Sequence, residues 1–572
     1  MTKRIITQAY LDYIWESKHE GLASELYNDP PIMMNDLRNR AVKLRRKYAK
    51  QEWHTDDRIV RLQAALTRIN RKLGCLSPKV KRTIEKLNQG AVEAAHQSIV
   101  LGGPCYILNK AVTAERLARL NSTEESSLVP FYCIADYDIV QSELTHTRTP
   151  LMGPSGNIVS IPIPQEYEFS PVSVVPLPEY HWYEEIEQSI RAGYSPLFKV
   201  LEGNTRTLFD ERLEYALSVT RQAFLNSDTL GEWAQRIIAR IVNIVGNLGL
   251  PLVPASDDEI RELWALGMEF LLSREIREDF VRIHDEATKK IRNNGFEPGA
   301  GGRDTSYVPF FYECQAKSCN RARTELFYEL DGSNAILRGE CPLCGEEIRL
   351  EVDAQSPDLS DHATFLSPRV DSRQFAIDSS IPVIAHAGGP GETAYYSQVI
   401  PIARKLEIPF PMFVKYPRVF FNTPWGEDMA NQLKRDNIPV LHRGEMFRAM
   451  GKITRSRNKE NYDEMNEAIQ NLAGIIWRTH DDLLDSLHNL ENEIEETEEH
   501  VEEEKLELKF KIETYLSWAY GRYAKGKNTQ ESSWSWIEWA LNAGLSDLFG
   551  PYKRAYMADM KNGATLFVNF MV

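Results

Sequence analysis

Seven cysteines are present, and four of them have the spacing of a metal site. Cys314, Cys319, Cys341 and Cys344 form the pattern C-x4-C…C-x2-C, whereas Cys75, Cys105 and Cys133 are isolated in largely apolar segments. Tetrahedral zinc is satisfied by four thiolates at about 2.3 Å, and two short cysteine loops on adjoining hairpins present them in this geometry. The pattern predicts a structural zinc ion without an open position for catalysis; an iron–sulfur cluster or free thiols are the alternatives. An odd count with this clustering argues against a disulfide framework.

A glycine-rich run, HAGGPGETAYYSQ from His386 to Gln398, follows the apolar segment IPVIA and opens a predicted helix. Backbone amides near Gly389 and Gly391 can approach an oxyanion there, and the helix N-terminus adds a favourable dipole. The run does not match G-x-x-x-x-G-K-[ST], which disfavours a P-loop kinase or ATPase. Glu392 has a second interpretation, because a carboxylate in the first turn also complements the helix dipole.

A second turn, Gly102-Gly103-Pro104, precedes another predicted helix in SIVLGGPCYILNK. Lys110 follows about two helical turns later, a distance from which an ammonium group can reach a phosphate at the turn. A surface lysine on a helix is the alternative interpretation.

Two apolar runs and the helix between them would position these residues. The strand-like SIVLGG, a helix from about Tyr106 to Leu120 and the run LVPFYCIADYD form a βαβ unit, which predicts a parallel sheet. Ligands of such sheets bind outside the carboxyl ends of the strands, so the glycine turn should share one rim with Asp136 and Asp138. At that rim the two carboxylates can bind an amine, a ribose or magnesium, or cap the next segment.

The same α/β texture returns from Pro382 to about Met450, after a helical stretch and the cysteine cluster. We therefore predict one nucleotide-type α/β fold that is interrupted in the middle. The predicted divisions are a helical N-terminal region (1–90), the first half of the core (91–150), a mainly helical connecting insertion (151–305), a four-cysteine zinc ribbon (306–355), the second half of the core (375–452), a coiled-coil helix (455–520) and a C-terminal helical segment (521–572).

A single long helix is expected from about residue 455 to 518, because apolar residues recur at spacings of four and three between Ile469 and Leu508. This heptad seam needs a partner, either another helix of the same chain or the same helix of a second copy in a homodimer. The tryptophans that follow predict a helix that docks back on the body; they are Trp534, Trp536 and Trp539.

The net charge of -15 is concentrated in one place, since ten glutamates and one lysine lie between Glu491 and Leu508. A general attraction to nucleic acid or to an anionic membrane is therefore not expected. The basic run from Arg38 to Lys50 could contact phosphates locally, or it is simply a solvated helix. The first ten residues lack the apolar centre of a signal peptide, and no run of about 18 apolar residues occurs, so we expect a cytoplasmic protein.

Read together, these segments resemble the bacillithiol synthase family, ligases that attach cysteine to glucosaminyl-malate. HQSIVLGGPCYILNKAVTAERLARL is similar to a glutamine-bearing strand and a G-P-x-Y…K helix, VPFYCIADYDIVQSE to V-P-x-F-W-I-A-x-x-D-H-D, and AGGPGETAYYSQ to G-P-G-E-x-A-Y-x-x-Q. A proline-rich strand ending in Arg418 and a long helix follow in the expected places. The chain departs from the family pattern at His96-Gln97, where paired glutamines are expected, and at Tyr137, where the pattern has histidine.

The resemblance implies a Rossmann-like core akin to class I aminoacyl-tRNA synthetases, connecting inserts and a coiled coil used for dimerisation. It also implies an ATP-dependent reaction, with magnesium, in which a cysteine carboxylate is activated and the amine of an aminosugar attacks it to form an amide. The catalytic residues on this interpretation are Lys110, Asp136, Asp138 and Glu392. The ligand-binding residues are Gln97, Gly102, Gly103, Pro104, Tyr106, Gly388, Gly389, Gly391, Tyr395, Gln398 and Arg418.

Other functions fit parts of the same pattern. A related adenylate-forming ligase would act on another amino acid or amine. A noncatalytic RNA-binding protein would keep the scaffold and use the zinc ribbon and the basic N-terminal helices as contact surfaces. A third interpretation makes the coiled coil an assembly strut. Nucleotide turnover that depends on cysteine would separate the cysteine ligase from these three alternatives.

Overall fold

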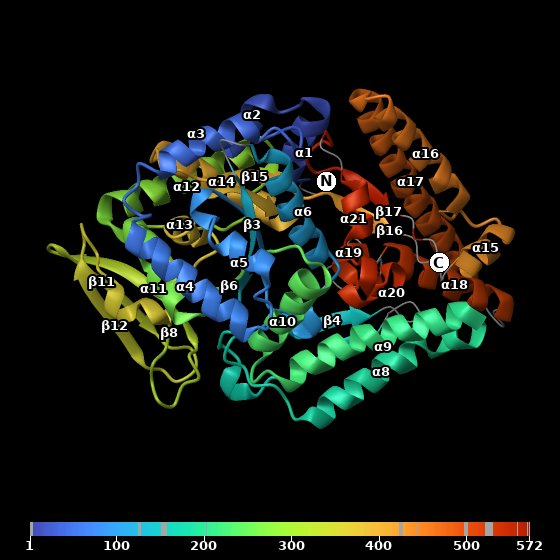
Figure 1. The fold of residues 1–572 in the computed structure, drawn as a ribbon, viewed down its shortest axis with the longest axis horizontal. Coiled ribbons are helices and arrows are strands. Elements are labelled where there is room, and N and C mark those ends of the chain that lie inside the picture. The colour runs from blue at the N-terminus through green and yellow to red at the C-terminus, as the bar shows by residue number, and fades with distance from the viewer. Residues whose placement is uncertain are drawn as a thin grey trace.

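A parallel five-stranded sheet forms the core of the protein (Figure 1). The computed structural model describes residues 4–123, 127–149, 157–201, 203–421, 427–441, 443–496, 502–520, 530–556, 559–568 and 570. The strand order is β15-β14-β2-β3-β6, with bounds Met412–Lys415, Val383–Gly388, Ala91–Gln97, Val129–Ala135 and Leu252–Pro254. Strands from the two predicted halves are direct neighbours, since β14 pairs with β2 in parallel. The prediction of one α/β core that is interrupted in the middle is confirmed.

The first strand lies earlier than the sequence indicated. We expected SIVLGG as a strand, but β2 is AVEAAHQ and the chain turns from Val100 to Gly103. The polar residues Glu93 and His96 interrupt the apolar pattern of β2 and hid the strand. Glu93 is tolerated in the sheet because its register partner on β14 is His386. The helix expected from Tyr106 to Leu120 is present as α6, Tyr106–Asn121.

Helices cover the sheet and connect its strands (Figure 1). The N-terminal elements are β1 (Arg4–Ile5), α1 (Thr7–Glu16), α2 (Glu20–Tyr27), α3 (Arg38–Tyr48), α4 (Asp56–Lys72) and α5 (Pro78–Ile84). After β3 come α7 (Ser142–Thr145), β4 (His146–Thr149), β5 (Asn157–Ser160), α8 (Tyr180–Val200), α9 (Gly203–Leu225), α10 (Leu230–Ala239), α11 (Asp258–Leu272), α12 (Arg274–Asn293) and β7 (Phe296–Glu297). The stretch expected to be mainly helical thus also supplies β6, a strand of the main sheet.

The four cysteines belong to a module of short antiparallel strands. These strands are β8 (Phe310–Glu313), β9 (Arg323–Glu325), β10 (Phe327–Asp331), β11 (Asn334–Glu340), β12 (Glu347–Asp353) and β13 (Leu366–Pro368), followed by α13 (Arg373–Asp378). The sheet β13-β8-β9 contacts α11 through β13, while the strands at β11 and β12 project away from the main sheet (Figure 1). Between β14 and β15 runs α14 (Pro390–Lys405).

The expected single C-terminal helix is divided into three helices. They are α16 (Arg443–Asn458), α17 (Tyr462–Glu495) and α18 (Glu503–Tyr520), and β16 (Arg418–Phe421) and α15 (Glu427–Arg435) precede them. The chain breaks before α17, where Glu460 has a φ of 56° and the Asn461 side chain caps the new helix. Helix α18 folds back antiparallel to α17, as the Lys509–Glu491 and Lys505–Glu493 pairs show.

The heptad seam of α17 is filled within the chain. Leu483 and Leu487 are buried in one apolar cluster with Ile512 and Leu516 of α18. Of the two partners that the sequence left open for this seam, the structure therefore has another helix of the same chain. Two residues of the predicted seam, Thr497 and Val501, lie outside the described residues.

The C-terminal segment docks on the glycine turn of the first half. It comprises α19 (Gln530–Ser533), α20 (Trp536–Ala543), α21 (Gly550–Ala555) and β17 (Thr565–Val568), and its three tryptophans are buried. The indole of Trp536 donates to the Leu101 carbonyl at 2.8 Å, and its amide donates to the Gly103 carbonyl at 3.2 Å. The predicted docking helix is confirmed. Among the described residues, no helix combines the length and apolarity needed to cross a bilayer.

Candidate active site

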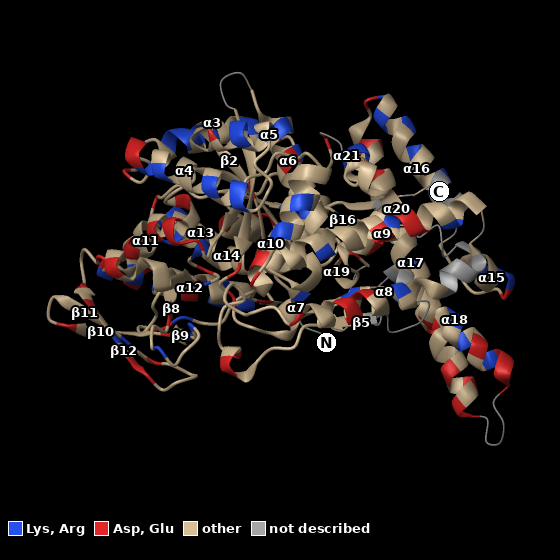
Figure 2. Ribbon diagram, turned by 60° about the horizontal axis from the view of Figure 1, so that its bottom comes forward, with Lys and Arg blue, Asp and Glu red and all other residues tan. Residues whose placement is uncertain are grey.

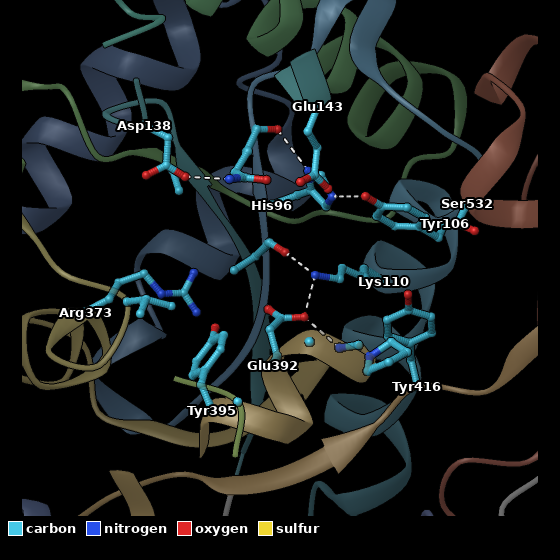
Figure 3. Close-up of a pocket in the computed structure, with 18 of the residues that line it drawn as sticks. His96, Tyr106, Lys110, Asp138, Glu143, Arg373, Glu392, Tyr395, Tyr416 and Ser532 are labelled. Atoms are coloured by element: carbon cyan, nitrogen blue, oxygen red, sulfur yellow. Dashed lines mark hydrogen bonds and ion pairs between the residues drawn. The ribbon is translucent and has the colours of Figure 1, made fainter. Parts of the chain in front are cut away.

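A pocket of about 810 Å³ opens at the carboxyl edge of the sheet, between the strands of the two halves (Figure 3). It is lined by Ala95, His96, Gln97, Tyr106, Lys110, Ala135, Tyr137, Asp138, Glu143, Gly299, Arg303, Phe311, Arg323, Arg369, Val370, Arg373, Gly389, Pro390, Gly391, Glu392, Tyr395, Lys415, Tyr416, Arg418, Glu531 and Ser532. This is the place where ligands of open parallel sheets bind. Seven side chains are lysine or arginine and four are carboxylates, so the wall favours anions although the whole chain carries -15.

Nine of the fifteen predicted site residues outside the cysteine cluster line this pocket. They are Lys110, Asp138, Glu392, Gln97, Tyr106, Gly389, Gly391, Tyr395 and Arg418. Six do not line it: Asp136, Gly102, Gly103, Pro104, Gly388 and Gln398. The segments around Lys110 and Glu392, almost three hundred residues apart, thus meet in one pocket. Of the two glycine turns, only the one at Gly389 lines it.

The six other residues have structural contacts. A Cβ on Gly102, whose φ is +78°, would lie 2.5 Å from Ile237, and one on Gly388 would lie 2.4 Å from the Phe413 ring. Pro104 pairs with Ser535 of the C-terminal segment. Gln398 donates to the Thr288 hydroxyl at 2.7 Å. The glycines of the first turn therefore permit close packing and a left-handed backbone, and they do not contribute a wall of the pocket.

Asp136 is buried and has a structural role. Its carboxylate accepts hydrogen bonds from Gln235 Nε2 at 2.7 Å and from the Ser256 amide at 2.9 Å, and the Ser256 hydroxyl donates to it as well. Burial raises the pKa of Asp136 to about 6, against the lowering effect of these hydrogen bonds. The position of Asp136 ties β3 to the segment after β6, and only its neighbour Asp138 faces the pocket.

A chain of alternating charges begins at the wall of the pocket with Lys110 and Glu392 and continues into the buried core beneath it; Figure 3 shows the Lys110–Glu392 part. The Lys110 ammonium donates to Glu392 Oε2 at 2.7 Å and to the Ala95 carbonyl at 2.8 Å. Glu392 Oε1 lies 3.1 Å from His386 Nε2, and His386 Nδ1 lies 3.0 Å from Glu93 Oε2. Lys110 and Glu93 come from the first half of the sheet, Glu392 and His386 from the second. The network therefore joins the two halves.

Burial and charge oppose each other along this network. Burial alone would raise the pKa of Glu392, but Lys110 and His386 hold it well below its usual range. Burial would lower the pKa of His386, but Glu93 and Glu392 raise it above its usual value. These directions favour two carboxylates that alternate with two cations, which is the arrangement that compensates buried charge.

Glu392 also caps its own helix. The Gly389 amide donates to Glu392 Oε2 at 2.6 Å, which satisfies one of the free amides at the N-terminus of α14. This amide was expected to hold an oxyanion, and in the structure the side chain of Glu392 occupies it. The second interpretation of Glu392, as the complement of the helix N-terminus, is the one that the geometry supports.

The opposite wall carries a hydrogen-bonded set around Asp138. Its carboxylate accepts from Gln97 Nε2 at 2.5 Å and from Arg323 Nη1 at 3.2 Å. Arg323 belongs to the cysteine module and stacks on the Phe311 ring at 4.1 Å. Its neighbour Ala322 accepts a hydrogen bond from the Cys314 amide at 3.0 Å. The cysteine cluster is thus directly connected to a residue of the pocket wall.

A histidine lines the pocket, although the position expected for one holds Tyr137. His96 Nδ1 lies 3.0 Å from the Gln97 carbonyl, and His96 Nε2 lies 2.6 Å from the Tyr106 hydroxyl. Because a carbonyl only accepts, this contact assigns the proton of a neutral His96 to Nδ1 and leaves Nε2 as the acceptor. An imidazole in this tautomer can take up a proton at Nε2.

The far end of the pocket holds a buried lysine and a buried glutamate. Burial and the neighbouring Arg418 lower the pKa of Lys415 to about 7, and the carboxylate of Glu531 opposes this shift. Burial raises the pKa of Glu531 to about 8, although the Val419 amide donates to it at 2.6 Å. Neither group is fully ionised at neutral pH, so this end can exchange protons with a bound ligand.

Comparison with known proteins relates this fold to one family. The family model "Bacillithiol biosynthesis BshC, N-terminal Rossmann-like domain" matches residues 2–419. The chain belongs to this family. The match contains the whole five-stranded sheet and every residue of the charge network, and it confirms the resemblance that the sequence motifs indicated.

Individual members of the BshC family are distant. A protein of Natranaerobius thermophilus is 24% identical over 424 residues, which cover 72% of this chain and 68% of that protein. A protein of Lysinibacillus sphaericus is 23% identical over 357 residues, covering 62% and 59%, and one of Koribacter versatilis is 23% identical over 344 residues, covering 59% and 56%. All three bear the name "Putative cysteine ligase BshC". The alignments thus span roughly six tenths of the length of these relatives.

Part of the pocket lies beyond the region that the BshC family model matches. Glu531 and Ser532 come from the C-terminal segment, more than a hundred residues past position 419. Sequence reasoning missed them, together with Arg373 and Lys415, because no local motif surrounds them. The sequence did contain a signal for Lys415, because it ends a strand three positions before the predicted Arg418.

The cysteine cluster fits a tetrahedral metal ion. The four Sγ atoms lie within 4.8 Å of one another, and the Cys314–Cys344 and Cys319–Cys341 pairs are each 3.7 Å apart. Four sulfurs at about 2.3 Å from a central ion would be separated by about 3.8 Å, so the observed spacing agrees with zinc. The set can therefore hold a metal ion, as the C-x4-C…C-x2-C pattern predicts.

Proposed function

We propose that this member of the BshC family is an ATP-dependent ligase that joins the carboxylate of cysteine to the amine of an aminosugar such as glucosaminyl-malate. The observation that carries the proposal is the 2.7 Å contact between Lys110 and Glu392, which closes one pocket from both halves of the sheet. The names of the relatives, which specify a cysteine ligase, support the same reaction.

The charges of the pocket suit these substrates. ATP, cysteine and a malate-bearing sugar all present phosphate or carboxylate groups, which the basic side chains can neutralise. Lys415 and Arg418 lie at one end for this purpose and Arg373 at the other. Asp138 and Glu143 are the acidic groups of the opposite wall, where they can hold an ammonium group or a magnesium ion that accompanies the nucleotide.

The reaction balances in two steps. A carboxylate oxygen of cysteine forms a bond to a phosphorus atom of ATP, and pyrophosphate or ADP leaves with the electrons of the broken P–O bond. The acceptor amine then attacks the activated carbonyl carbon, an amide C–N bond forms, and AMP or phosphate leaves. His96 Nε2 takes up the proton that the amine loses, through the Tyr106 hydroxyl that lies 2.6 Å from it. Lys110 stays bound to Glu392 and Ala95, so its charge is fixed in place before the phosphate charge develops.

The cysteine cluster has a structural role in this scheme. We propose that it binds zinc through Cys314, Cys319, Cys341 and Cys344, and that the ion holds the module that presents Arg323 to the pocket. The homodimer expected from the long helix stays a prediction. Since α18 already fills the seam of α17, a dimer would need another surface, such as the exposed Leu506 and Phe510.

Nucleotide turnover tests the proposal. Purified protein with ATP, cysteine and glucosaminyl-malate should produce AMP or ADP together with the amide, detected by mass spectrometry, and omission of cysteine should abolish both products. Lys110→Met should lower kcat/KM by about a hundredfold. Lys289→Met removes an exposed lysine paired with Asp285 and serves as the matched control. Equal turnover with every amino acid, or RNA binding without any turnover, would refute the cysteine ligase.

A further inference from the structure

The basic run at 38–50 is not used by the active site and lines a second cavity. Helix α3 contains Arg38, Arg40, Lys43, Arg45, Arg46 and Lys47 and no acidic residue. In Figure 2 the ribbon of α3 is largely blue, the colour of Lys and Arg. One face of α3, the end of α14 and the loop before β15 enclose a volume of about 680 Å³. The cavity is lined by Tyr27, Asn28, Arg40, Lys43, Leu44, Lys47, Lys50, Gln51, Ile400, Arg404, Glu407, Ile408, Pro409, Phe410, Pro411 and Met412.

The cations of this cavity form one row. Arg40, Lys43 and Lys47 are separated by three and four residues, so they share one face of α3 and extend over about 10 Å. Lys50 follows in the turn after α3 and lines the same cavity. Arg404 of α14 adds a fifth charge, and Glu407 is the single acidic residue of the lining. Within the described part of the chain, the side chains of the three lysines and of Arg404 make no ion pair or hydrogen bond. The row is therefore available to an external anion.

The mouth of the cavity is held in a particular backbone conformation. Asn28 and Asp29 are consecutive non-glycine residues with φ of 54° and 53°, which is a costly arrangement. Both of their carbonyls accept hydrogen bonds from the Arg40 guanidinium, at 2.7 Å for Asn28. Arg40 thus ties this turn to the basic face of α3.

The other wall is apolar. Leu44, Ile400, Ile408 and Met412 contribute aliphatic surface, and Phe410 lies between two prolines. A ligand that suits both walls carries several anionic groups in an extended arrangement and a compact apolar part. The volume lies in the range of small-molecule sites, and the charge of -15 on the whole chain would repel a long nucleic acid.

We propose that this cavity is a second ligand site that binds a small polyanion with two or more phosphate groups. It is separate from the active site, which lies at the opposite end of α14, where Gly389 and Glu392 begin that helix. The proposal does not depend on the ligase reaction. It assigns a role to Lys43 and Lys47, whose side chains make no contact with the pocket at the sheet edge.

Binding of inorganic pyrophosphate and tripolyphosphate to the full chain tests this site. Isothermal titration should detect tripolyphosphate binding tighter than that of pyrophosphate, and raising the salt from 50 to 300 mM should weaken it at least about fivefold by screening. The double variant Lys43→Ala/Lys47→Ala should weaken it at least about tenfold. Both lysines are exposed, so circular dichroism should show an unchanged fold.

Two variants serve as controls. Arg46→Ala/Lys81→Ala also removes two exposed positive charges, but neither residue lines the cavity, so binding should change by less than about twofold. Lys110→Met reports on the other pocket. The proposal is overturned if the chain binds neither anion, if the control pair weakens binding as much as the test pair, or if only Lys110→Met weakens it. Tighter binding of a single-stranded oligonucleotide than of tripolyphosphate would also overturn it, in favour of a nucleic-acid surface.

Discussion

The ion pair between Lys110 and Glu392 makes a quantitative prediction, because it is buried and joins the two halves of the sheet. The side chains are 6% and 14% exposed, and the charged atoms are 2.7 Å apart. At an effective dielectric of about 20, the attraction at this distance is about 6 kcal/mol, and desolvation opposes it. Glu392→Gln keeps the size of the side chain but leaves a buried lysine without its partner, which costs about 3–5 kcal/mol in comparable sites.

A double-variant cycle separates the pair from its surroundings. Lys110→Met leaves Glu392 in contact with His386 and with the Gly389 amide, so we expect it to cost less, about 2–3 kcal/mol. The double variant has no unpaired charge from this pair. Its penalty should therefore be smaller than the sum of the two single penalties by about 2 kcal/mol.

The penalty of Glu392→Gln should also depend on pH in a defined way. The folded pKa of Glu392 lies well below its ordinary value of 4.5, so its stabilising effect is complete above that value and is lost as the pH falls through the folded pKa. The pKa of His386 is raised above 6.5, so the contribution of its charge is complete below 6.5 and is lost as the pH rises through the folded value. The penalty should be largest between these limits and should decrease in mildly alkaline solution.

Urea unfolding, followed by tryptophan fluorescence and by circular dichroism, measures these penalties. Glu278→Gln is the control, since Glu278 forms an exposed pair with Arg274 at 3.2 Å and should contribute less than about 0.5 kcal/mol. A penalty below about 1 kcal/mol for Glu392→Gln, or a double variant whose penalty equals the sum of the singles, would refute the reasoning. In that case the β14–β2 pairing and the packing around it would hold the two halves of the sheet together without help from this ion pair.

Two further predictions follow from the buried lysine and from the cysteine cluster. The pKa of Lys415 falls from 10.5 to about 7 on folding, so the unfolded chain binds more protons than the folded chain between these pH values. The stability of the wild type relative to Lys415→Met should therefore rise by about 2 kcal/mol between pH 7 and pH 9. If urea unfolding gives the same stability difference between the two proteins at both pH values, the prediction is contradicted. Cys341→Ser should lower the zinc content, measured by elemental mass spectrometry, from about one ion per chain to below about 0.2. Cys75→Ser changes a buried cysteine outside the cluster and should leave the zinc content unchanged. Zinc retained by Cys341→Ser would argue against the four-thiolate site.

The parts of the fold that the sequence predicted are those with a strong local signal. The strand before Gly389, helix α6 and the docking of the C-terminal tryptophans each have an apolar pattern or a turn residue of their own. The strand β2 was misplaced because Glu93 and His96 break its pattern, and the burial of Glu93 depends on His386, almost three hundred residues away. A pairing of that kind is a tertiary property and leaves no period in the sequence.

The same distinction separates the predicted pocket residues from the missed ones. Lys110, Glu392 and Tyr395 lie in segments with a recognisable motif, and they do line the pocket. Arg323 and Arg373 come from the cysteine module and the segment after it, and Glu531 from the C-terminal segment, so only the folded chain brings them together. A basic or acidic residue alone in such a segment is far more often solvated than functional, and the sequence offers no means to choose among them.

The Gly102-Gly103-Pro104 turn shows why a glycine motif is weak evidence for a ligand. Two glycines before a helix were predicted to hold an anion, because their amides can approach one closely. In the structure the freedom of Gly102 and Gly103 permits positive φ angles, and the close approach is that of Ile237 and the Trp536 indole. A glycine reports that something lies close to the backbone, and it does not report what. The turn at Gly389 supports the same conclusion, since its amide is bound by the carboxylate of Glu392, and the anion-binding capacity of the pocket rests on its lysines and arginines.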